Sequence, residues 1–556
     1  MPTSEIQMRM EQWTRAQFTA SAIRPSRESE APQTRYVAMQ DGIRLKTIIT
    51  LPVRLTGGEQ FPTILVRSCY PQQDALLRTR AEEFAKRGFC FVYQWCRGTG
   101  GSEGVWEPNI HERSDGLDTL AWLSSQAYVR NIGYWGDSYL ALTGWCMADA
   151  VPEKVKTMVL GVYGVDRYTS AYQDGLFRMD VLTSWAKENA GLEITVSNDA
   201  SYKFRPQMEV DEVLWGTHLS WYRDWVRNPE CSDYWRKGFW GMLREIPKKV
   251  RIPLFIREGW YDHHLGSALV SYKDLPEEIR QHSLLQIGPW NHAYQPVIPE
   301  EHVSVADDSM TAPLQWFHRI LVENDLPDGQ IQEYIIGANK WSIQKELAQP
   351  LYKPFYLHDQ KLLEAVPEID SVRTYCYDPE VPVQSHGCES LLSSMRENGS
   401  FLQPLPNYRD DVLSFISNEL DEPLLLDGEI MVKLYVSSDA EDTAFSAKVM
   451  EVLPDGRTVN VRGSITSLAF RNGDEKIASY QPGTPVMVTI HMWRIAWCFR
   501  KGSKIRLDIS SSDYPQYTIH SNYAGLWSLQ KETKKARQCV HMGLRHPSVV
   551  LLPISN

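Results

Sequence analysis

The sequence lacks three features that would place it in other classes of protein: an excess of positive charge, a long apolar run and paired cysteines. Its formal net charge is −11 at pH 7 over 556 residues, whereas nucleic acids and anionic membranes are bound by basic surfaces. No stretch of about 18 apolar residues occurs, so no membrane-spanning helix is expected. The opening residues, MPTSEIQMRMEQWTRAQF, contain no apolar core of signal-peptide length. We therefore expect neither nucleic acid nor a membrane among the partners.

The nine cysteines are odd in number, widely spaced and free of any C-x-x-C pair. Most have apolar neighbours, as in FCFVYQWC, so we expect reduced, buried thiols rather than a disulfide framework. This pattern predicts a cytoplasmic location. The cysteines are Cys69, Cys90, Cys96, Cys146, Cys231, Cys376, Cys388, Cys498 and Cys539.

Aromatic residues are abundant instead, at 11% of the chain with 19 tryptophans. Because tryptophan is costly to leave exposed, this number predicts a large core together with an aromatic-lined pocket or lid. A single core stops growing near roughly 250–300 residues, so the length predicts two or three domains.

The first half of the chain alternates apolar strands with helical patterns. Residues 1–34 are polar and form an N-terminal extension, and the alternation around Asp41-Gly42 predicts a hairpin. Short apolar runs with helices between them follow. They predict a parallel, doubly wound sheet of an α/β fold in residues 35–165 and 248–345.

Two further domains are expected. Between residues 166 and 247 the apolar spacing is helical, which predicts an inserted helical cap domain. From 346 to 556, short strands separated by Gly, Pro and Asp turns predict an all-β jelly-roll sandwich. Six tryptophans fall in the cap, and we expect most in its core and some facing a pocket. They are Trp185, Trp215, Trp221, Trp225, Trp235 and Trp240.

The segment NIGYWGDSYLALTGW, residues 131–145, combines a strand, a sharp break and a helix. Ser138 lies at the break, where a nucleophile elbow would lift its hydroxyl out of the sheet and aim the next backbone N–H at the same point. Gly136 is one of the small neighbours that such a turn requires, but Leu140 stands where the general G-x-S-x-G pattern has its second glycine. Taken alone, the segment also fits a serine that caps a helix.

Two later strands end in residues that would complete a catalytic triad. PLFIREGWYDHH is a strand followed by a loop with Asp262, and LLQIGPWNHA is the next strand followed by a loop with His292. Because the carboxyl ends of parallel strands meet at one edge of a sheet, both are expected to lie beside Ser138. Each alone also fits a loop-capping acid or a surface histidine, but the order serine, acid, histidine is that of α/β-hydrolases.

These stretches, together with others, resemble the CocE/NonD hydrolases, a family that includes Xaa-Pro dipeptidyl-peptidase-like enzymes. The resemblance spans about residues 35–530 and implies an α/β-hydrolase domain, an inserted helical cap and a C-terminal jelly roll. The matching stretches are CRGTGGSEG (96–104), ERSDGLDTLAWLSSQ (112–126), GDSYL (136–140), GWYDHH (259–264), GPWNH (288–292), GANKW (337–341), AFSAKVMEVLPDG (444–456) and FRKGSKIRLDISSSDYPQY (499–517).

The resemblance also implies roles for individual residues. Ser138 would be the nucleophile, His292 the general base and then acid, and Asp262 the group that orients the imidazole and stabilises its charged form. The backbone N–H of Tyr139 and the hydroxyl of Tyr70 would bind the oxyanion.

Asp137 departs from the family, which usually has an uncharged residue beside the nucleophile. We expect its carboxylate to point away from the site and to cap the helix or pair with a cation.

No metal and no other cofactor is expected. Asp262, His263 and His264 are neighbours in sequence, but no third spaced ligand follows them. A structural polar network is expected instead from another set of residues, Arg97, Glu103, Asp115 and Asp118.

The predicted function is hydrolysis of a small-molecule ester through an acyl-enzyme. Alternatives are an amidase, acylase or peptidase, acyl transfer in a biosynthetic pathway, and a catalytically weak binding protein on the hydrolase fold. A homodimer is compatible with the sequence, which does not require one. A substrate with a free amine would need carboxylates from the cap, for which the candidates are Asp174, Asp180, Glu188 and Asp211.

Overall fold

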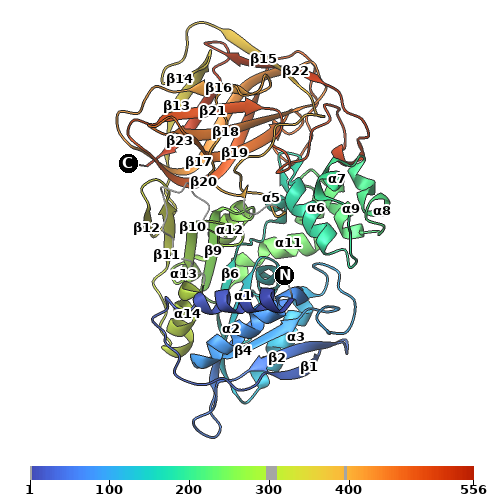
Figure 1. Cartoon of the computed structure of the whole chain (residues 1–556), viewed down its shortest axis with the longest axis vertical. Coiled ribbons are helices and arrows are strands. Elements are labelled where there is room, and N and C mark those ends of the chain that lie inside the picture. Colours follow the sequence, from blue (N-terminus) through green and yellow to red (C-terminus); the bar gives the residue numbers. More distant parts are fainter. Residues whose placement is uncertain (1–2, 296–309, 394–396, 556) are drawn as a thin grey trace.

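The computed structural model describes residues 3–295, 310–393 and 397–555. Over these ranges the chain forms an α/β-hydrolase domain at the lower end of Figure 1, a helical cap beside it and an all-β jelly roll at the upper end. The fold class predicted from the sequence is confirmed.

The described strands of the hydrolase domain form one ten-stranded sheet with a parallel centre. Neighbouring strands from β4 to β11 run parallel, whereas β1, β2 and β12 are antiparallel at the two edges. The hairpin predicted around Asp41-Gly42 joins β1 to β2. In spatial order the strands are β1 Gln33–Ala38, β2 Arg44–Thr50, β4 Cys90–Trp95, β3 Phe61–Ser68, β5 Val129–Asp137, β6 Val155–Gly161, β9 Leu254–Tyr261, β10 Leu284–Asn291, β11 Gln330–Ile335 and β12 Lys340–Gln344.

Helices cover both faces of this sheet, because alternate side chains of a strand point to opposite sides. In β3, Ile64 and Val66 pack in a core with Phe84 of α2, whereas Leu65 packs in the core on the other face with Leu120 of α3. The helices of this domain are α1 Thr3–Ala16, α2 Asp74–Lys86, α3 Glu112–Ser125, α4 Tyr139–Trp145, α12 Leu265–Lys273, α13 Glu277–Arg280 and α14 Thr311–Phe317.

The N-terminal extension is docked on the hydrolase domain. Arg15 of α1 forms ion pairs with Glu82 (2.6 Å) and Glu83 (2.7 Å) of α2. Phe18 is 1% exposed and meets Phe84 edge-on at 5.6 Å between ring centroids. The first strand begins at Gln33, so the extension leads directly into the sheet.

The cap lies between β6 and β9 in the chain and contains a feature that the helical pattern did not predict. A two-stranded hairpin, β7 (Tyr172–Gln173) and β8 (Leu176–Phe177), turns at Asp174 and Gly175, both with positive φ. Asp-Gly is the sequence signal for such a two-residue turn. The cap helices are α5 Arg167–Ala171, α6 Met179–Glu188, α7 Asn198–Lys203, α8 Val210–Val213, α9 Ser220–Arg227, α10 Asp233–Arg236 and α11 Gly238–Glu245.

The jelly roll packs against the hydrolase strand that carries the predicted triad acid. Arg462 donates a 2.6 Å hydrogen bond to the carbonyl of Trp260, two residues before Asp262. The Cys498 N–H also donates to the carbonyl of Ile336 at 2.8 Å. The described strands of the jelly roll are β13 Leu351–His358, β14 Lys361–Leu363, β15 Ser371–Tyr377, β16 Leu413–Ile416, β17 Leu424–Ser438, β18 Ala444–Val452, β19 Thr458–Ser467, β20 Val486–Phe499, β21 Lys504–Ser510, β22 Ala536–Met542 and β23 Val549–Ile554.

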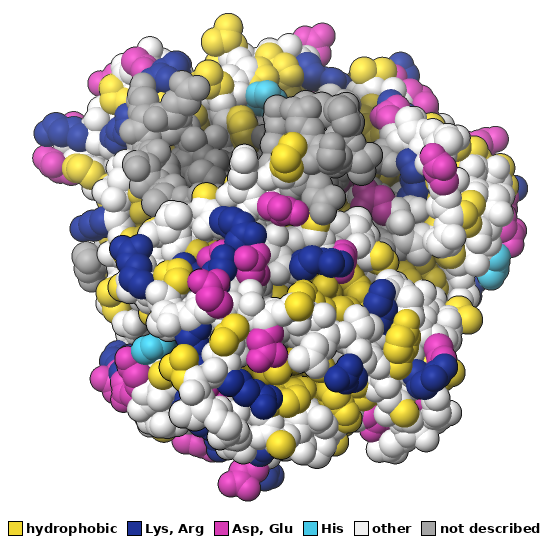
Figure 2. All heavy atoms as spheres, turned by 60° about the horizontal axis from the view of Figure 1, so that its bottom comes forward, with side chains coloured by type: hydrophobic (Ala, Val, Ile, Leu, Met, Phe, Trp, Pro, Cys, Tyr) yellow, Lys and Arg dark blue, Asp and Glu magenta, His cyan; other side chains and the backbone are white. Residues whose placement is uncertain are grey.

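The surface mixes charges of both signs. On the face in Figure 2, Lys and Arg side chains are interspersed with Asp and Glu. Among the helices in the described ranges, none combines the length and apolar character needed to cross a bilayer. The nine cysteines are all free thiols and six of them are buried, as the sequence predicted.

Candidate active site

Ser138 occupies a sharp turn between β5 and α4. Its φ of 58° and ψ of −127° lie outside the regions that non-glycine residues normally adopt, which is typical of a nucleophile elbow. The Ser138 N–H donates to the carbonyl of Gly161 at 3.0 Å. A Cβ on Gly136 would lie 2.1 Å from the carbonyl oxygen of Leu140, so glycine is required there. The turn thus forms with Leu140 in place of the second glycine.

The three predicted triad residues lie within hydrogen-bond distance of one another. His292 Nε2 is 2.9 Å from Ser138 Oγ, and His292 Nδ1 is 2.6 Å from Asp262 Oδ2. Asp262 follows β9 and His292 follows β10, which are parallel neighbours in the sheet. The shared edge of the parallel strands therefore brings together residues up to 154 positions apart in the chain.

Asp262 is ionised although it is fully buried. Burial by itself raises the pKa of this carboxyl, but the facing His292 and the hydrogen bonds that it accepts lower it below the usual value. One of these bonds comes from the His264 N–H, 2.6 Å from Oδ1. The carboxylate is held by both oxygens and can fix the orientation of the His292 ring.

His263 and His264 are neutral imidazoles packed beside His292. Their ring centroids lie 4.4 and 5.8 Å from that of His292. Burial lowers the pKa of both rings well below the usual value. Because neither ring is charged, a positive charge on His292 would have Asp262 as its immediate counterion.

The two predicted oxyanion donors lie beside Ser138. Tyr139 is the first residue of α4, where a backbone N–H has no acceptor within the helix. The Tyr70 hydroxyl lines the same cavity and accepts a 2.9 Å hydrogen bond from Trp185 Nε1. Burial raises the pKa of Tyr70 well above its usual value, so the hydroxyl keeps the proton that it would donate.

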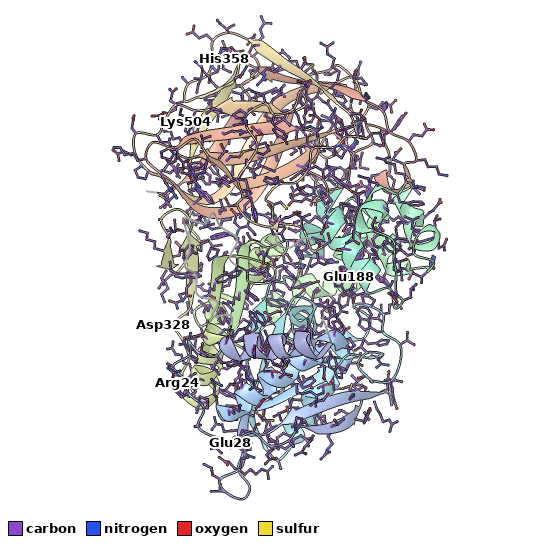
Figure 3. All side chains as sticks on the ribbon, viewed as in Figure 1. Arg24, Glu28, Glu188, Asp328, His358 and Lys504 are labelled. Carbon is purple, nitrogen blue, oxygen red and sulfur yellow. The ribbon has the colours of Figure 1, made fainter. Side chains whose placement is uncertain are left out.

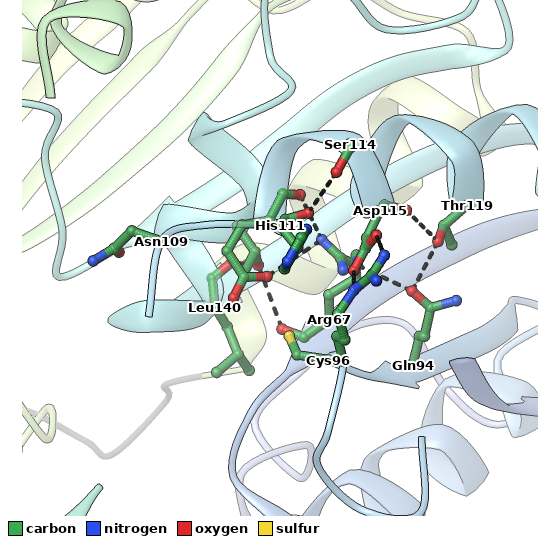
Figure 4. Close-up of polar contacts among 12 residues, drawn as sticks. Arg67, Gln94, Cys96, Asn109, His111, Ser114, Asp115, Thr119 and Leu140 are labelled. Carbon is green, nitrogen blue, oxygen red and sulfur yellow. Dashed lines mark hydrogen bonds and ion pairs between the residues drawn. The ribbon is translucent and has the colours of Figure 1, made fainter. Parts of the chain in front are cut away.

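The side chain of Tyr139 anchors the elbow from below. Its hydroxyl donates to Glu112 of α3 at 2.8 Å and accepts from the Asn109 N–H at 2.9 Å. Figure 4 shows the polar contacts around this helix, where Arg67 donates to the carbonyl of Glu112 at 2.8 Å. The start of the ERSDGLDTLAWLSSQ stretch thus supports the turn that carries Ser138.

The polar network predicted from the same region is only partly formed. Arg97 pairs with Asp115 at 2.7 Å and with Asp41 at 2.6 Å. The other two predicted members have separate partners, since Glu103 pairs with Arg44 and Asp118 accepts from the Gln40 N–H. The predicted members do not join into one network because residues of the β1–β2 hairpin, Gln40, Asp41 and Arg44, take up their side chains one by one.

Ser138 and His292 open into a cavity of about 590 Å³. Its walls come from all parts of the molecule, including Trp13 of α1, Trp185 and Trp225 of the cap, and Leu392 of the jelly-roll domain. Some cap tryptophans thus face the cavity and others are buried in the core, as expected. Those of the core alone are Trp215, Trp235 and Trp240. Trp13 was not predicted here, since nothing local to the N-terminal helix indicates what it packs against.

Asp137 faces the cavity rather than pointing away from it. Its Oδ1 accepts a 2.8 Å hydrogen bond from the Tyr294 hydroxyl, and its side chain lines the cavity. Arg80 lies close enough for the Asp137 charge to oppose the effect of burial, which lowers the pKa of Arg80 to about 10. The expectation of a helix-capping Asp137 is therefore wrong, and its charge is offset by neighbours that lie far away in sequence.

Of the four cap acids considered for amine binding, only Glu188 lines the cavity. It is the last residue of α6 and is labelled in Figure 3. Asp180 is buried and accepts from the Ser393 N–H at 3.0 Å, and Asp211 pairs with Arg223 at 2.8 Å. Asp174 lies in the β7–β8 turn. The site therefore does not gather the cap carboxylates around Ser138.

Among the described residues, Asp262, His263 and His292 have ligand atoms within 4.8 Å of one another. Two of these residues already share the 2.6 Å hydrogen bond that orients His292. A metal ion bound by all three would have to replace that bond, so the geometry favours the triad over a metal site.

Glu258 of β9 is a second carboxyl behind the site. It is 0% exposed, and neither oxygen has a hydrogen-bond partner among the described residues. Burial and the nearby Asp262 charge raise its pKa well above the usual value, so folded Glu258 keeps its proton to a higher pH than a free glutamate does.

This state predicts a pH-dependent effect of Glu258→Gln, which mimics the protonated acid. Unfolded glutamate ionises near pH 4.5 and folded Glu258 ionises only at a higher pH, so wild-type stability is lost as the pH rises from 4.5 to the folded pKa. The variant lacks this loss. We expect the unfolding free energy of Glu258→Gln minus that of the wild type to increase by about 1.4 kcal/mol per pH unit, up to the pKa of folded Glu258.

Urea unfolding at pH 5, 6, 7 and 8 measures this difference. Glu451→Gln is the matched control, because Glu451 is also 0% exposed but accepts hydrogen bonds from Trp497 and Ser503. That control should lose stability at every pH. A difference for Glu258→Gln that stays constant with pH would contradict the protonated state.

Comparison with known proteins places this site in a family. Residues 41–294 match the model of the X-Pro dipeptidyl-peptidase (S15 family), and residues 336–551 match that of the X-Pro dipeptidyl-peptidase C-terminal non-catalytic domain. Cocaine esterase from Rhodococcus sp. (strain MB1 Bresler) is 28% identical over 93% of this chain and 97% of its own length. The chain belongs to the CocE/NonD family of hydrolases. It is a serine hydrolase acting on ester or amide bonds.

Solved structures show the same fold over nearly the whole chain. An α-amino acid ester hydrolase aligns with a TM-score of 0.83 and 20% identity, covering 97% of this CocE/NonD chain and 98% of its own. An aminopeptidase from a marine sediment Thaumarchaeota archaeon aligns with a TM-score of 0.81 and 19% identity, covering 95% and 96%. At these identities the likeness establishes the fold.

Two arginines that were not predicted as site residues also line the cavity, Arg80 and Arg167. A signal for Arg167 was present, because it follows β6 at the same sheet edge as the triad. No comparable signal marks Arg80, which lies in the middle of α2.

Proposed function

We propose that this CocE/NonD hydrolase cleaves a carboxylic ester of a small molecule through an acyl-enzyme on Ser138. The observation that supports it most directly is the continuous chain of hydrogen bonds from Asp262 through His292 to Ser138 at the cavity. A serine hydroxyl becomes a competent nucleophile when such a base accepts its proton.

In the first half-reaction, Ser138 Oγ attacks the ester carbonyl carbon while His292 Nε2 takes the hydroxyl proton. The oxyanion accepts hydrogen bonds from the Tyr139 N–H and the Tyr70 hydroxyl. Asp262 stabilises the imidazolium through Nδ1. The C–O bond then breaks, and Nε2 returns the proton to the departing alcohol.

In the second half-reaction, water attacks the acyl-enzyme carbonyl and His292 Nε2 takes its proton. The tetrahedral intermediate collapses, the proton passes to Ser138 Oγ, and the carboxylic acid leaves. Nucleophile, base and orienting acid are regenerated, so no cofactor is consumed.

The cavity favours an ester over a peptide with a free amino terminus. Of the cap acids, only Glu188 reaches it, and Asp137 is engaged by Tyr294. Two arginines line the same space and would repel an ammonium group. Amide hydrolysis and acyl transfer use the same triad, and a panel of ester, anilide and alcohol-acceptor assays with product analysis separates them.

The decisive test is labelling with a fluorophosphonate followed by intact mass measurement. We expect the wild type to gain one phosphonyl group with loss of fluoride, because an activated serine attacks phosphorus as it attacks an acyl carbon. The adduct should be absent from Ser138→Ala and strongly slowed in His292→Ala.

Ser125→Ala is the matched control, because Ser125 is exposed at the end of α3 and bonds only to the backbone of Trp122 and the side chain of Gln126. It should label like the wild type. A folded wild type without an adduct, or an adduct that persists in Ser138→Ala, would overturn the proposal in favour of the binding alternative.

A further inference from the structure

Arg167 is a buried cation to which the described part of the chain supplies no carboxylate partner. It is the first residue of α5, is 8% exposed and lines the cavity that contains Ser138. Among the described residues no carboxylate lies within 4.0 Å of its guanidinium, and its buried Nε has no hydrogen-bond partner. A buried charge is costly unless it is paired, so a missing anion is indicated.

The acid next to Arg167 in the sequence is committed elsewhere. Asp166 pairs with Arg244 at 3.4 Å. The two acids that line the cavity, Asp137 and Glu188, do not reach Arg167 either. The described residues therefore position this guanidinium and supply no carboxylate for it.

Two tryptophans hold the guanidinium in place. Its central carbon lies 4.6 Å from the ring centroid of Trp225 and 5.7 Å from that of Trp240. Contacts of this kind orient an arginine and leave the edge of its planar fork available to bind a carboxylate with two hydrogen bonds.

Aromatic side chains connect this position to the nucleophile. Tyr139, next to Ser138, stacks on Trp185 at 5.8 Å between centroids, and Trp185 lies 5.9 Å from Trp225. His264 and Tyr163 also line the cavity, with 4.4 Å between their ring centroids. Arg167 acts electrostatically on both of these side chains. The cavity is thus an aromatic passage with Ser138 at one position and a cation further along.

We infer that the substrate carries a carboxylate, separated from the scissile carbonyl by a short apolar chain, and that Arg167 binds it. This inference rests on the proposed function and adds the substrate class: a half-ester of a dicarboxylic acid, or an ester whose alcohol portion bears a carboxylate. The same guanidinium would serve either, because only the side of the scissile bond differs.

The test compares charged and neutral versions of one substrate. The mono-4-nitrophenyl ester of glutaric acid carries the anion in its acyl portion, and its methyl ester is the neutral equivalent. The acetyl ester of 4-hydroxybutyrate and its methyl ester form the corresponding pair with the anion in the alcohol portion. For each pair, the readout is kcat/KM for the anionic substrate divided by kcat/KM for its neutral equivalent. In one of the two pairs we expect this charged-to-neutral ratio to exceed one in the wild type and to fall about 100-fold in Arg167→Met.

Arg80→Met is the matched control, because Arg80 is the other arginine that lines the cavity and also packs on a tryptophan, Trp135 at 4.4 Å. The charged-to-neutral ratio should survive this change. Arg167→Lys, which keeps the charge, should retain part of the preference and guards against misfolding of the methionine variant. A ratio that is unaltered in Arg167→Met, or lost in Arg80→Met instead, would overturn the inference.

A binding measurement separates this inference from the proposed function. Glutarate should bind to Ser138→Ala in calorimetry, and Arg167→Met in that background should weaken binding about 100-fold. Glutarate binding without ester hydrolysis by the wild type would support the anion site and contradict the proposed function. Fluorophosphonate labelling of Ser138 without glutarate binding and without any charge preference would support the proposed function and contradict the anion site.

Discussion

Replacement of Ser138 by alanine is expected to lower kcat for an ester substrate by about 10⁴–10⁶-fold. The reason is that Ser138 Oγ is the atom within 2.9 Å of His292 Nε2, and no second hydroxyl in the described site shares that position. Steady-state rates of the purified variant, with far-ultraviolet circular dichroism to verify folding, measure the loss. Product should still form at the slow rate that the oxyanion donors and binding alone support.

The triad residues should act as one unit. His292→Ala is expected to cost about as much as Ser138→Ala, and the double variant should be no slower than either. Asp262→Asn should cost about 10⁴-fold, because the hydrogen bond that it offers to Nδ1 stabilises the wrong tautomer of His292. Losses that multiply in the double variant, or a Ser138→Ala rate within tenfold of the wild type, would contradict this assignment.

Tyr70→Phe is expected to lower kcat by about 10²–10³-fold with a much smaller change in KM. The hydroxyl accepts its 2.9 Å bond from Trp185 and shares its proton with the Cys69 thiol, a weak acceptor. An oxyanion is a stronger acceptor, and its charge develops only in the transition state. The separate measurement of kcat and KM on one ester is the readout, because a merely structural role would change stability without this split.

Two further variants serve as controls for Tyr70. Tyr163 lines the cavity on the side of His264, so Tyr163→Phe should cost less than tenfold. Trp185→Phe removes the donor to Tyr70 and should give an intermediate loss in kcat. Equal losses in Tyr70→Phe and Tyr163→Phe would show that the effect comes from the cavity wall in general rather than from an oxyanion donor.

Much of the candidate site could be predicted from the sequence, because short sequence patterns indicate where each of its residues lies relative to a strand or helix. A strand, a glycine and a serine before a helix predict an elbow, and Ser138 is found in one. Asp262 and His292 directly follow apolar strands, and in a parallel sheet that placement alone brings them to one edge. Tyr70 and Tyr139 depended on the family resemblance for their roles, and both line the cavity that contains Ser138.

Other features could not be predicted because they depend on side chains that meet only in the folded chain. The charge of Asp137 is offset by Tyr294 and Arg80, which lie 157 positions later and 57 positions earlier. The β7–β8 hairpin turns at Asp174-Gly175, a turn signal within a region whose helical spacing predicted a helical cap.

The sequence by itself predicted the α/β-hydrolase architecture, because strand periodicity and turn chemistry are local properties, and with the family resemblance it predicted which residues would be nucleophile, base and acid. The tertiary structure decided which charges remain unpaired in the cavity. Among the described residues Arg167 has no carboxylate partner, and its neighbour Asp166 pairs with Arg244 instead. Pairing of this kind depends on distances between side chains from separate elements, and those distances exist only after the cap has packed on the sheet.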